Sequence, residues 1–133
     1  MSAYSTKKTV YKDRDCLVAA LNDQGYKTVE VHDVAQHLIG YHGDRRPEIA
    51  NVIVRREHIC SAANDIGWVK NTDGTYSEII SAFDSRKHNA TWLTSLKDRY
   101  SEHLNIKTAK GLGAHLLRRT VVGGKVQLEF VVK

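Results

Sequence analysis

The carboxylates that could form a hydrolytic site in this sequence are Asp65 and Glu78. Metal-dependent nucleases place an acidic pair on adjoining strands, because two carboxylates can hold the cation that activates water. Such sites often carry a lysine two residues after the second acid, but Ile80 occupies that position here. A metal-dependent hydrolase or nuclease is therefore only a second alternative, and its cleft would also need Asp84, His88 and an arginine.

The histidines and cysteines do not follow the spacing of a metal site. His32, His37 and His42 recur every five residues, whereas two ligands on one helical face need a spacing of three or four. Cys16 and Cys60 lie far apart and outside any C-x-x-C motif, which is typical of reduced, buried thiols in an intracellular protein. We therefore expect no metal and no other cofactor.

Motifs that activate a nucleophile or bind a phosphate are absent from the sequence. It contains no G-x-S-x-G, no glycine-rich loop ending in Lys-Ser/Thr and no G-x-G-x-x-G. Gly111-Leu112-Gly113 is too short for a phosphate loop and is typical of the end of a helix. We expect no catalytic residue, and the sequence favours a role without enzymatic activity.

A short segment with two glycines around aromatic residues is the best candidate for a contact surface. Glycine lets the backbone approach a ligand or another chain closely, although the same composition also forms tight structural loops. Arginine beside an aromatic residue is common in protein interfaces and where nucleic-acid bases stack. The candidate contact surface has six residues: Gly40, Tyr41, His42, Gly43, Arg45 and Arg46.

The chain is basic, with 20 Lys and Arg against 15 Asp and Glu, a formal net charge of +5 and a pI near 9.3. This charge gives a mild attraction to polyanions. The basic residues form separate pairs instead of one cluster: Lys7-Lys8, Arg45-Arg46, Arg55-Arg56, Arg86-Lys87 and Arg118-Arg119. Nucleic-acid binding through arginine pairs and aromatic residues is thus an alternative, although the sequence has no RNP, KH or zinc-knuckle motif.

A single domain is expected to position these residues. A chain of 133 residues suits one core, and 41% hydrophobic with 26% charged residues is close to the globular average. The polar segment 1–8 is expected to be a flexible N-terminus, and 9–133 a single α+β domain. Because no long apolar stretch follows this segment, we expect neither a signal peptide nor a membrane anchor, and a cytoplasmic protein.

The first half of the chain is expected to combine one helix with short strands. The helix covers 16–24, because Asp15 can cap its first turn and Gly25 can end it. β-Branched residues predict strands over three segments: 9–11, 26–31 and 49–56. Residues 32–47 are expected to form a loop or an irregular strand, with Pro47 just before the next strand.

A β-hairpin is expected in the middle of the chain, with strands at 66–70 and 75–80 around a turn at 71–74. We place Lys70 opposite Thr75, which fixes the face of every other side chain. The faces are then Ile66, Trp68 and Ile79 on one side and Val69, Tyr76 and Ile80 on the other. Because both faces are partly apolar, this hairpin should lie in the centre of its sheet.

The last third is expected to form the main amphipathic helix and a second hairpin. Apolar residues recur at helical spacing from Thr91, and the helix either continues until Gly111 or Gly113 ends it or bends near Asn105. The hairpin strands are 115–122 and 125–132, joined by Gly123-Gly124. Strict alternation in the second strand predicts one apolar face that packs on a core and one face that meets solvent.

The arginines of this second hairpin are candidate anion-binding residues. A two-residue turn places Arg118 opposite Glu129 and Arg119 opposite Leu128. Adjacent strand residues project to opposite faces, so either Arg118 or Arg119 must point to the apolar side. The inward arginine either reaches solvent or a carboxylate along its aliphatic stem, or binds an anion at a cleft.

The order of these motifs resembles the sequence pattern of a known protein family. The pattern consists of Gly40-Tyr41-His42-Gly43, Asp65-Ile66-Gly67-Trp68, Tyr76, Asp84, a helix with Trp92, Leu96 and Tyr100, and the terminal Gly123-Gly124 hairpin. It is similar to a domain-of-unknown-function family that includes the plastid and cyanobacterial conserved hypothetical proteins of reading frame thirty-five. The chain departs from it by a longer stretch between Arg56 and Asp65 and by tryptophan in place of phenylalanine. The resemblance implies a compact α+β domain and no established activity.

We therefore expect an α+β fold with an antiparallel-rich sheet of about five to seven strands and two principal helices packed on one face. The expected function is a small non-catalytic protein-interaction or assembly domain. Its partner is expected to be another protein or a second copy of the chain, with nucleic acid as the alternative and no membrane.

Overall fold

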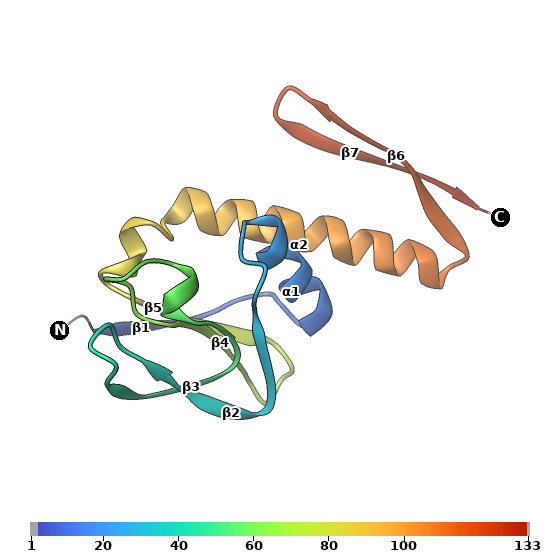
Figure 1. Cartoon of the computed structure of the whole chain (residues 1–133). Coiled ribbons are helices and arrows are strands. Elements are labelled where there is room, and N and C mark those ends of the chain that lie inside the picture. Colours follow the sequence, from blue (N-terminus) through green and yellow to red (C-terminus); the bar gives the residue numbers. More distant parts are fainter. Residues whose placement is uncertain (1–2, 133) are drawn as a thin grey trace.

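The computed structural model describes residues 3–132, and it shows the expected α+β fold (Figure 1). One antiparallel sheet has five strands in the order β1-β5-β4-β3-β2, and a second sheet consists of β6 and β7. The strands are β1 (Tyr4–Lys8), β2 (Glu30–Ile39), β3 (Arg45–Val54), β4 (Ile66–Lys70), β5 (Tyr76–Ser81), β6 (Ala114–Val122) and β7 (Lys125–Val132). The helices are α1 (Arg14–Asp23) and α2 (Ala90–Gly111), with short 3-10 turns η1 (Arg56–His58) and η2 (Asp84–Arg86).

The two helices begin at polar caps and end at glycines. α1 starts two residues earlier than expected, because the carboxylate of Asp13, not that of Asp15, accepts a hydrogen bond from the Cys16 amide at 2.9 Å. Asn89 caps α2 by accepting from the Trp92 amide at 3.0 Å. α2 then runs as one helix to Gly111, which is the first of the two arrangements that the sequence left open.

The main core lies between the two helices and one face of the five-stranded sheet. Trp68 in β4 is fully buried there, beside Leu17 of α1 and Leu96 of α2. The Tyr100 hydroxyl also accepts hydrogen bonds from the amides of Lys12 and Asp13, at 2.9 and 3.0 Å, which ties α2 to the start of α1. Both principal helices therefore pack on the same face, as expected.

A smaller core lies on the opposite face of the sheet, between side chains of β2, β3 and β5. Leu38, Ala50, Ile53 and Ile79 are buried together in this second core. Gly67 makes this packing possible, because a Cβ at this position would lie 2.6 Å from the Ala50 Cβ. The sequence predicted regular strands at 26–31 and 49–56 and a loop or an irregular strand at 32–47; the irregular strand is confirmed, because β2 runs from Glu30 to Ile39 with bulges, and β3 already begins at Arg45. Pro47 thus lies within β3.

The first strand lies earlier than expected. β1 occupies Tyr4–Lys8, inside the segment 1–8 that was expected to be a flexible N-terminus, and no strand covers 9–11. It pairs with β5 at the edge of the sheet, where Lys7 stands opposite Glu78. Its side chains are mostly exposed, so the sequence carries no apolar alternation that would mark a strand. Residues 1–2 and 133 lie outside the described residues.

The central hairpin has the expected position but a different register. Lys70 pairs with Tyr76 instead of Thr75, because the Asn71 amide bonds the Thr75 carbonyl at 2.7 Å and lengthens the loop by one residue. Tyr76 therefore lies on the helix side with Trp68, while Ile79 faces the second core. This corrects the predicted assignment of side chains to the two faces of the hairpin. A shift of one residue on one strand exchanges the faces to which its side chains point.

The terminal hairpin has the expected register but not the expected packing. Arg118 pairs with Glu129 and Arg119 with Leu128 around Gly123-Gly124. β6 and β7 stand apart from the five-stranded sheet: the hairpin starts at the end of α2 and runs back above that helix, as Figure 1 shows in red. Val126 and Phe130 are 37% and 36% exposed, so the predicted core contact of this face is absent.

Candidate functional site

The loop at 40–43 is a tight turn between β2 and β3. The Gly40 amide bonds the Asp44 carbonyl at 2.8 Å, and Gly43 adopts a φ of 80° that favours glycine. The rings of Tyr41 and His42 are in contact, with their centroids 3.8 Å apart, and both side chains are exposed. Glycine at 40 is explained by space, because a Cβ there would lie 2.5 Å from Oδ1 of Asp44, and glycine at 43 by its φ, while the two rings remain exposed to solvent.

The two arginines of the candidate contact surface point to different sides. Arg45 is exposed, whereas the Arg46 side chain is only 11% exposed. The Arg46 guanidinium lies over the Tyr4 ring, 5.0 Å from its centroid, and 3.9 Å from the Asp44 carboxylate. The six candidate residues therefore do not form one continuous patch.

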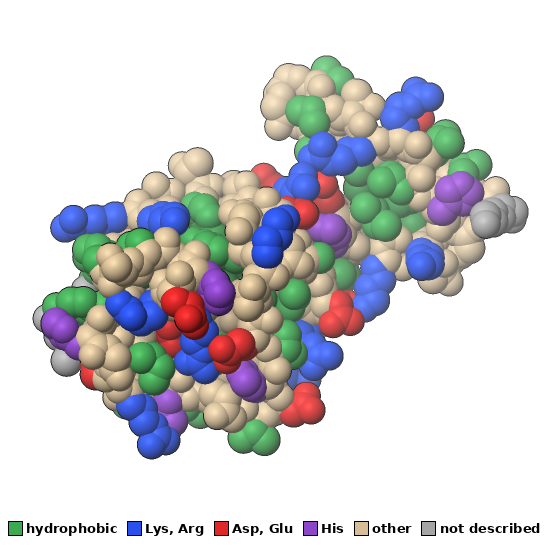
Figure 2. All heavy atoms as spheres, in the orientation of Figure 1, with side chains coloured by type: hydrophobic (Ala, Val, Ile, Leu, Met, Phe, Trp, Pro, Cys, Tyr) green, Lys and Arg blue, Asp and Glu red, His purple; other side chains and the backbone are tan. Residues whose placement is uncertain are grey.

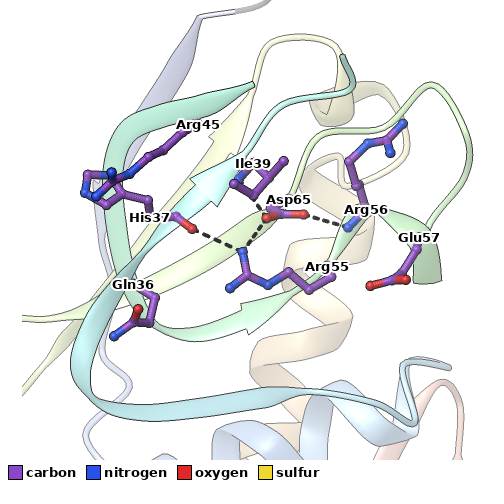
Figure 3. Close-up of a pocket in the computed structure, with 8 residues that line it drawn as sticks. All are labelled: Gln36, His37, Ile39, Arg45, Arg55, Arg56, Glu57 and Asp65. Carbon is purple, nitrogen blue, oxygen red and sulfur yellow. Dashed lines mark hydrogen bonds and ion pairs between the residues drawn. The ribbon is translucent and has the colours of Figure 1, made fainter. Parts of the chain in front are cut away.

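A polar cavity of about 480 Å³ lies beside this turn, and Asp65 is at its centre (Figure 3). Asp65 is fully buried and accepts three hydrogen bonds of 2.7 Å, from the Ile39 amide, the Arg56 amide and Nη1 of Arg55. The cavity is lined by Gln36, His37, Ile39, Arg45, Arg55, Arg56, Glu57 and Asp65. Because strands β2 and β3 and the start of β4 meet at this carboxylate, it closes the curved sheet.

Arg55 joins the buried carboxylate to the surface. Its Nε and Nη2 each donate to Glu30 at 2.9 Å, and Nη1 also donates to the His37 carbonyl at 3.1 Å. The hydrogen bonds from Arg55 lower the pKa of the Glu30 carboxyl. With these bonds in place, Arg55 and Asp65 form a satisfied structural network and not an anion site.

A second buried network connects the loop after β5 to the start of β2. Oδ2 of Asp84 accepts from Oγ of Ser81 at 2.7 Å and from the Asn64 amide at 3.0 Å. Nε2 of His88 lies 2.6 Å from the Tyr26 hydroxyl, and Nδ1 lies 3.2 Å from the Asp84 carbonyl. Burial lowers the pKa of His88 and raises the pKa of Tyr26 to about 12, which favours the neutral form of both.

The residues proposed for a hydrolase site therefore take part in different interactions. Asp65 and Asp84 belong to two different networks, and Glu78 accepts a hydrogen bond from Nε1 of Trp68 at 3.1 Å. Within residues 3–132, no group of three or more His, Cys, Asp or Glu side chains could hold a metal ion. Glu78 and His88 line the same two hollows, but neither Asp65 nor Asp84 lines them, so the four residues do not share one cleft.

The candidate anion-binding arginines have different surroundings. Arg119 faces α2, where its Nε and Nη2 each lie 3.1 Å from an oxygen of Glu102. Arg118 faces solvent with 64% of its side chain exposed and lies 3.9 Å from Glu129. The inward arginine thus reaches a carboxylate, which was one of the two expected arrangements.

A groove of about 760 Å³ separates α2 from the terminal hairpin. Asp98 and Glu102 line it from the helix, while Val126, Leu128 and Phe130 line it from β7. Figure 2 shows apolar side chains gathered on this part of the surface, and Lys and Arg side chains scattered among Asp and Glu elsewhere on the visible face. The alternation in β7 was recognised in the sequence, but its exposure depends on what packs against it.

Two further findings concern the surface and the chain as a whole. Cys60 is exposed, contrary to the prediction of two buried thiols, while Cys16 is buried. No helix among residues 3–132 has the length and apolar character needed to cross a membrane.

Comparisons with protein-family models, curated proteins and solved structures give no match, and the resemblance to the reading frame thirty-five family stays a prediction.

Proposed function

We propose that this chain is a non-catalytic assembly domain that associates with a second copy of itself through β7. One observation carries the proposal: the apolar face of the terminal hairpin is turned toward an open groove beside α2 and is not buried, with Val126 37% and Phe130 36% exposed. An isolated two-stranded hairpin is marginally stable at best, and stability needs further strands or a packed face. A second copy that pairs along the edge of this hairpin would supply the further strands.

The backbone of the hairpin supports pairing along its outer edges. β6 and β7 form a two-stranded sheet, so each has one edge with unpaired backbone groups among the described residues. Such an edge is a template for another strand. β7 contains Lys125 and Glu129, whereas β6 contains Arg118 and Arg119 and no acid. Charge therefore favours β7 as the pairing edge.

The sequence of β7 is complementary to itself in one register. Antiparallel pairing centred on Gln127 places Lys125 opposite Glu129 of the second copy, and two-fold symmetry repeats this pair. In the same register Val126 stands opposite Leu128 of the second copy, so the apolar face continues across the interface. Pairing of two β6 strands about their centre would instead place arginine next to arginine.

The arginine pairs give less support to the nucleic-acid alternative. Arg55 is held by Glu30 and Asp65, and Arg119 is held by Glu102. Nε of Arg56 donates to the Ala63 carbonyl at 2.9 Å. These side chains already have partners, and the five basic pairs lie on different elements of the fold.

Charge reversal tests the assembly directly, with molar mass from light scattering or sedimentation as the readout. We expect a dimer for the unmodified chain, and monomers for Lys125→Glu and for Glu129→Lys, because each places like charges opposite each other. The combined Lys125→Glu and Glu129→Lys variant should recover the dimer. Glu57→Lys, outside the hairpin, is the control and should remain dimeric.

Two results would overturn this proposal. One is a strictly monomeric chain over the whole accessible concentration range. The other is a dimer that persists in both single charge reversals. Glu129→Lys also faces Arg118 within its own hairpin, so the cleaner single variant is Lys125→Glu, which pairs with Val122.

A further inference from the structure

We propose that the groove between β1, β5 and the N-terminal half of α2 binds a small zwitterionic molecule. In this site Glu78 receives the ammonium group, and Lys7 and Lys97 face the carboxylate. The site is separate from the terminal hairpin and does not depend on self-association. Its central observation is a buried carboxyl group with unused hydrogen-bonding capacity.

Glu78 is only 7% exposed and accepts one hydrogen bond, from Nε1 of Trp68 to Oε1 at 3.1 Å. Among residues 3–132, it makes no other hydrogen bond and no ion pair. A carboxylate can accept about four hydrogen bonds, and a buried charge is costly without partners. Burial accordingly raises the pKa of Glu78. A donor that reaches Oε2 would therefore complete the hydrogen bonding of this carboxylate.

Glu78 lines two adjoining hollows of about 280 and 760 Å³. Leu93 lines both hollows, and Ile80 and Ala82 add apolar wall to the smaller one. His88 also lines both, but its two ring nitrogens already contact Tyr26 and Asp84. The groove thus combines an apolar wall with polar side chains, among which Glu78 is the buried acid; a few placed polar groups beside apolar surface are typical of a small-molecule site.

The rim of the groove carries the opposite charge. Lys7 stands opposite Glu78 in the β1–β5 register, and Lys97 lines the larger hollow from α2. Both are exposed and form no salt bridge within the described chain, although the charge of Lys7 acts on Glu78 and partly offsets the effect of burial on the pKa of that carboxyl. Lys8, by contrast, already pairs with Asp73 at 2.6 Å. An acid inside and two available cations at the rim complement a molecule with an ammonium group at one end and a carboxylate at the other.

Trp68 supplies a direct readout, because its indole N–H contacts Glu78. In the ¹⁵N-labelled chain, ε-aminohexanoate should shift the Trp68 Nε1–H resonance saturably at millimolar concentration. Hexylamine, which lacks the carboxylate, should bind more weakly, and hexanoate, which lacks the ammonium, should not shift this resonance. Glu78→Gln should weaken ε-aminohexanoate binding at least about tenfold, since it removes a charge-assisted hydrogen bond. Lys97→Ala should weaken it several-fold.

The control is Glu57→Gln, an exposed acid at the other cavity, which should leave the titration unchanged. In Glu78→Gln the introduced amide oxygen can still accept from Trp68, so a dispersed Trp68 resonance verifies that this variant is folded. If that variant fails to fold, the three probes and Lys97→Ala decide the question. The proposal is wrong if ε-aminohexanoate causes no saturable shift, if Glu78→Gln binds equally well, or if hexanoate produces the same response.

Discussion

Arg119 of β6 and Glu102 of α2 form a two-point ion pair, in which two guanidinium nitrogens each lie 3.1 Å from a carboxylate oxygen. Glu102 is 12% exposed, and it also lies 3.5 Å from Arg99. Because the apolar face of the hairpin lines an open groove and is not buried, this pair is a principal tie between the hairpin and the helical layer. Planar, bidentate geometry of this kind fixes orientation as well as position.

Removal of the Arg119 side chain should loosen the hairpin without unfolding the domain. In Arg119→Ala, amide hydrogen exchange in 114–132 should accelerate, while exchange in the five-stranded sheet stays slow. The matched control is Arg118→Ala, whose side chain points to solvent 3.9 Å from Glu129. Equal acceleration in both variants would show that the contact with Glu102 does not hold the hairpin.

Replacement of Asp65 should strongly destabilise the main domain. Asp65→Ala leaves the Arg55 guanidinium without a buried partner and two amides without an acceptor, so we expect a loss of about 3–5 kcal/mol. Urea unfolding measures the free energy of unfolding. Asp33→Ala is the control, because its side chain is 97% exposed and should change stability little. A loss below about 1 kcal/mol in Asp65→Ala would contradict the closing role of this carboxylate.

Stability should fall on mild acidification because of His88. Burial lowers its pKa in the folded state below the ordinary value of 6.5, so the unfolded chain binds the proton more readily. This contribution is fully present above the unfolded pKa and is lost as the pH falls through the folded pKa. The free energy of unfolding should therefore decrease below about pH 6.5, and less steeply in His88→Gln. Parallel pH curves for the two proteins would refute this assignment.

The two thiols should react at very different rates. Cys60 is exposed, whereas Cys16 is buried, and burial raises the pKa of the Cys16 thiol to about 11. Iodoacetamide should modify Cys60 in the folded chain and modify Cys16 only after unfolding, because the thiolate is the reactive form. Peptide mass spectrometry identifies the labelled site, and Cys60→Ser should leave the folded chain nearly unlabelled.

The sequence predicted those elements whose signals are local. Apolar residues at helical spacing from Thr91 and the glycines after residue 110 indicated α2, and Gly123-Gly124 sets the register of Arg118 against Glu129. β1 was missed because an exposed edge strand needs no apolar alternation. The register of the central hairpin differs from the predicted one by one residue. Its loop is closed by a backbone hydrogen bond between Asn71 and Thr75, which hydrophobic periodicity does not reveal.

The candidate site was harder to predict, because it depends on contacts between distant segments. Arg45 and Arg46 are adjacent in sequence but lie on opposite sides of β3, and Arg46 stacks on Tyr4. The sequence could show that β7 has an apolar face. It could not show that this face lies over a groove beside α2, since the position of the hairpin follows from tertiary contacts such as Arg119 with Glu102.

Gly67 couples the evolution of two positions that are far apart in the chain. A methyl group at 67 would lie 2.6 Å from the Ala50 Cβ and 3.0 Å from Cδ2 of Leu38, so these neighbours would have to shift. A residue with a side chain can be accommodated at position 67 only if position 50 has no side chain. In any lineage that keeps this closed sheet, drift at these two sites should therefore be correlated, with their combined volume held nearly constant.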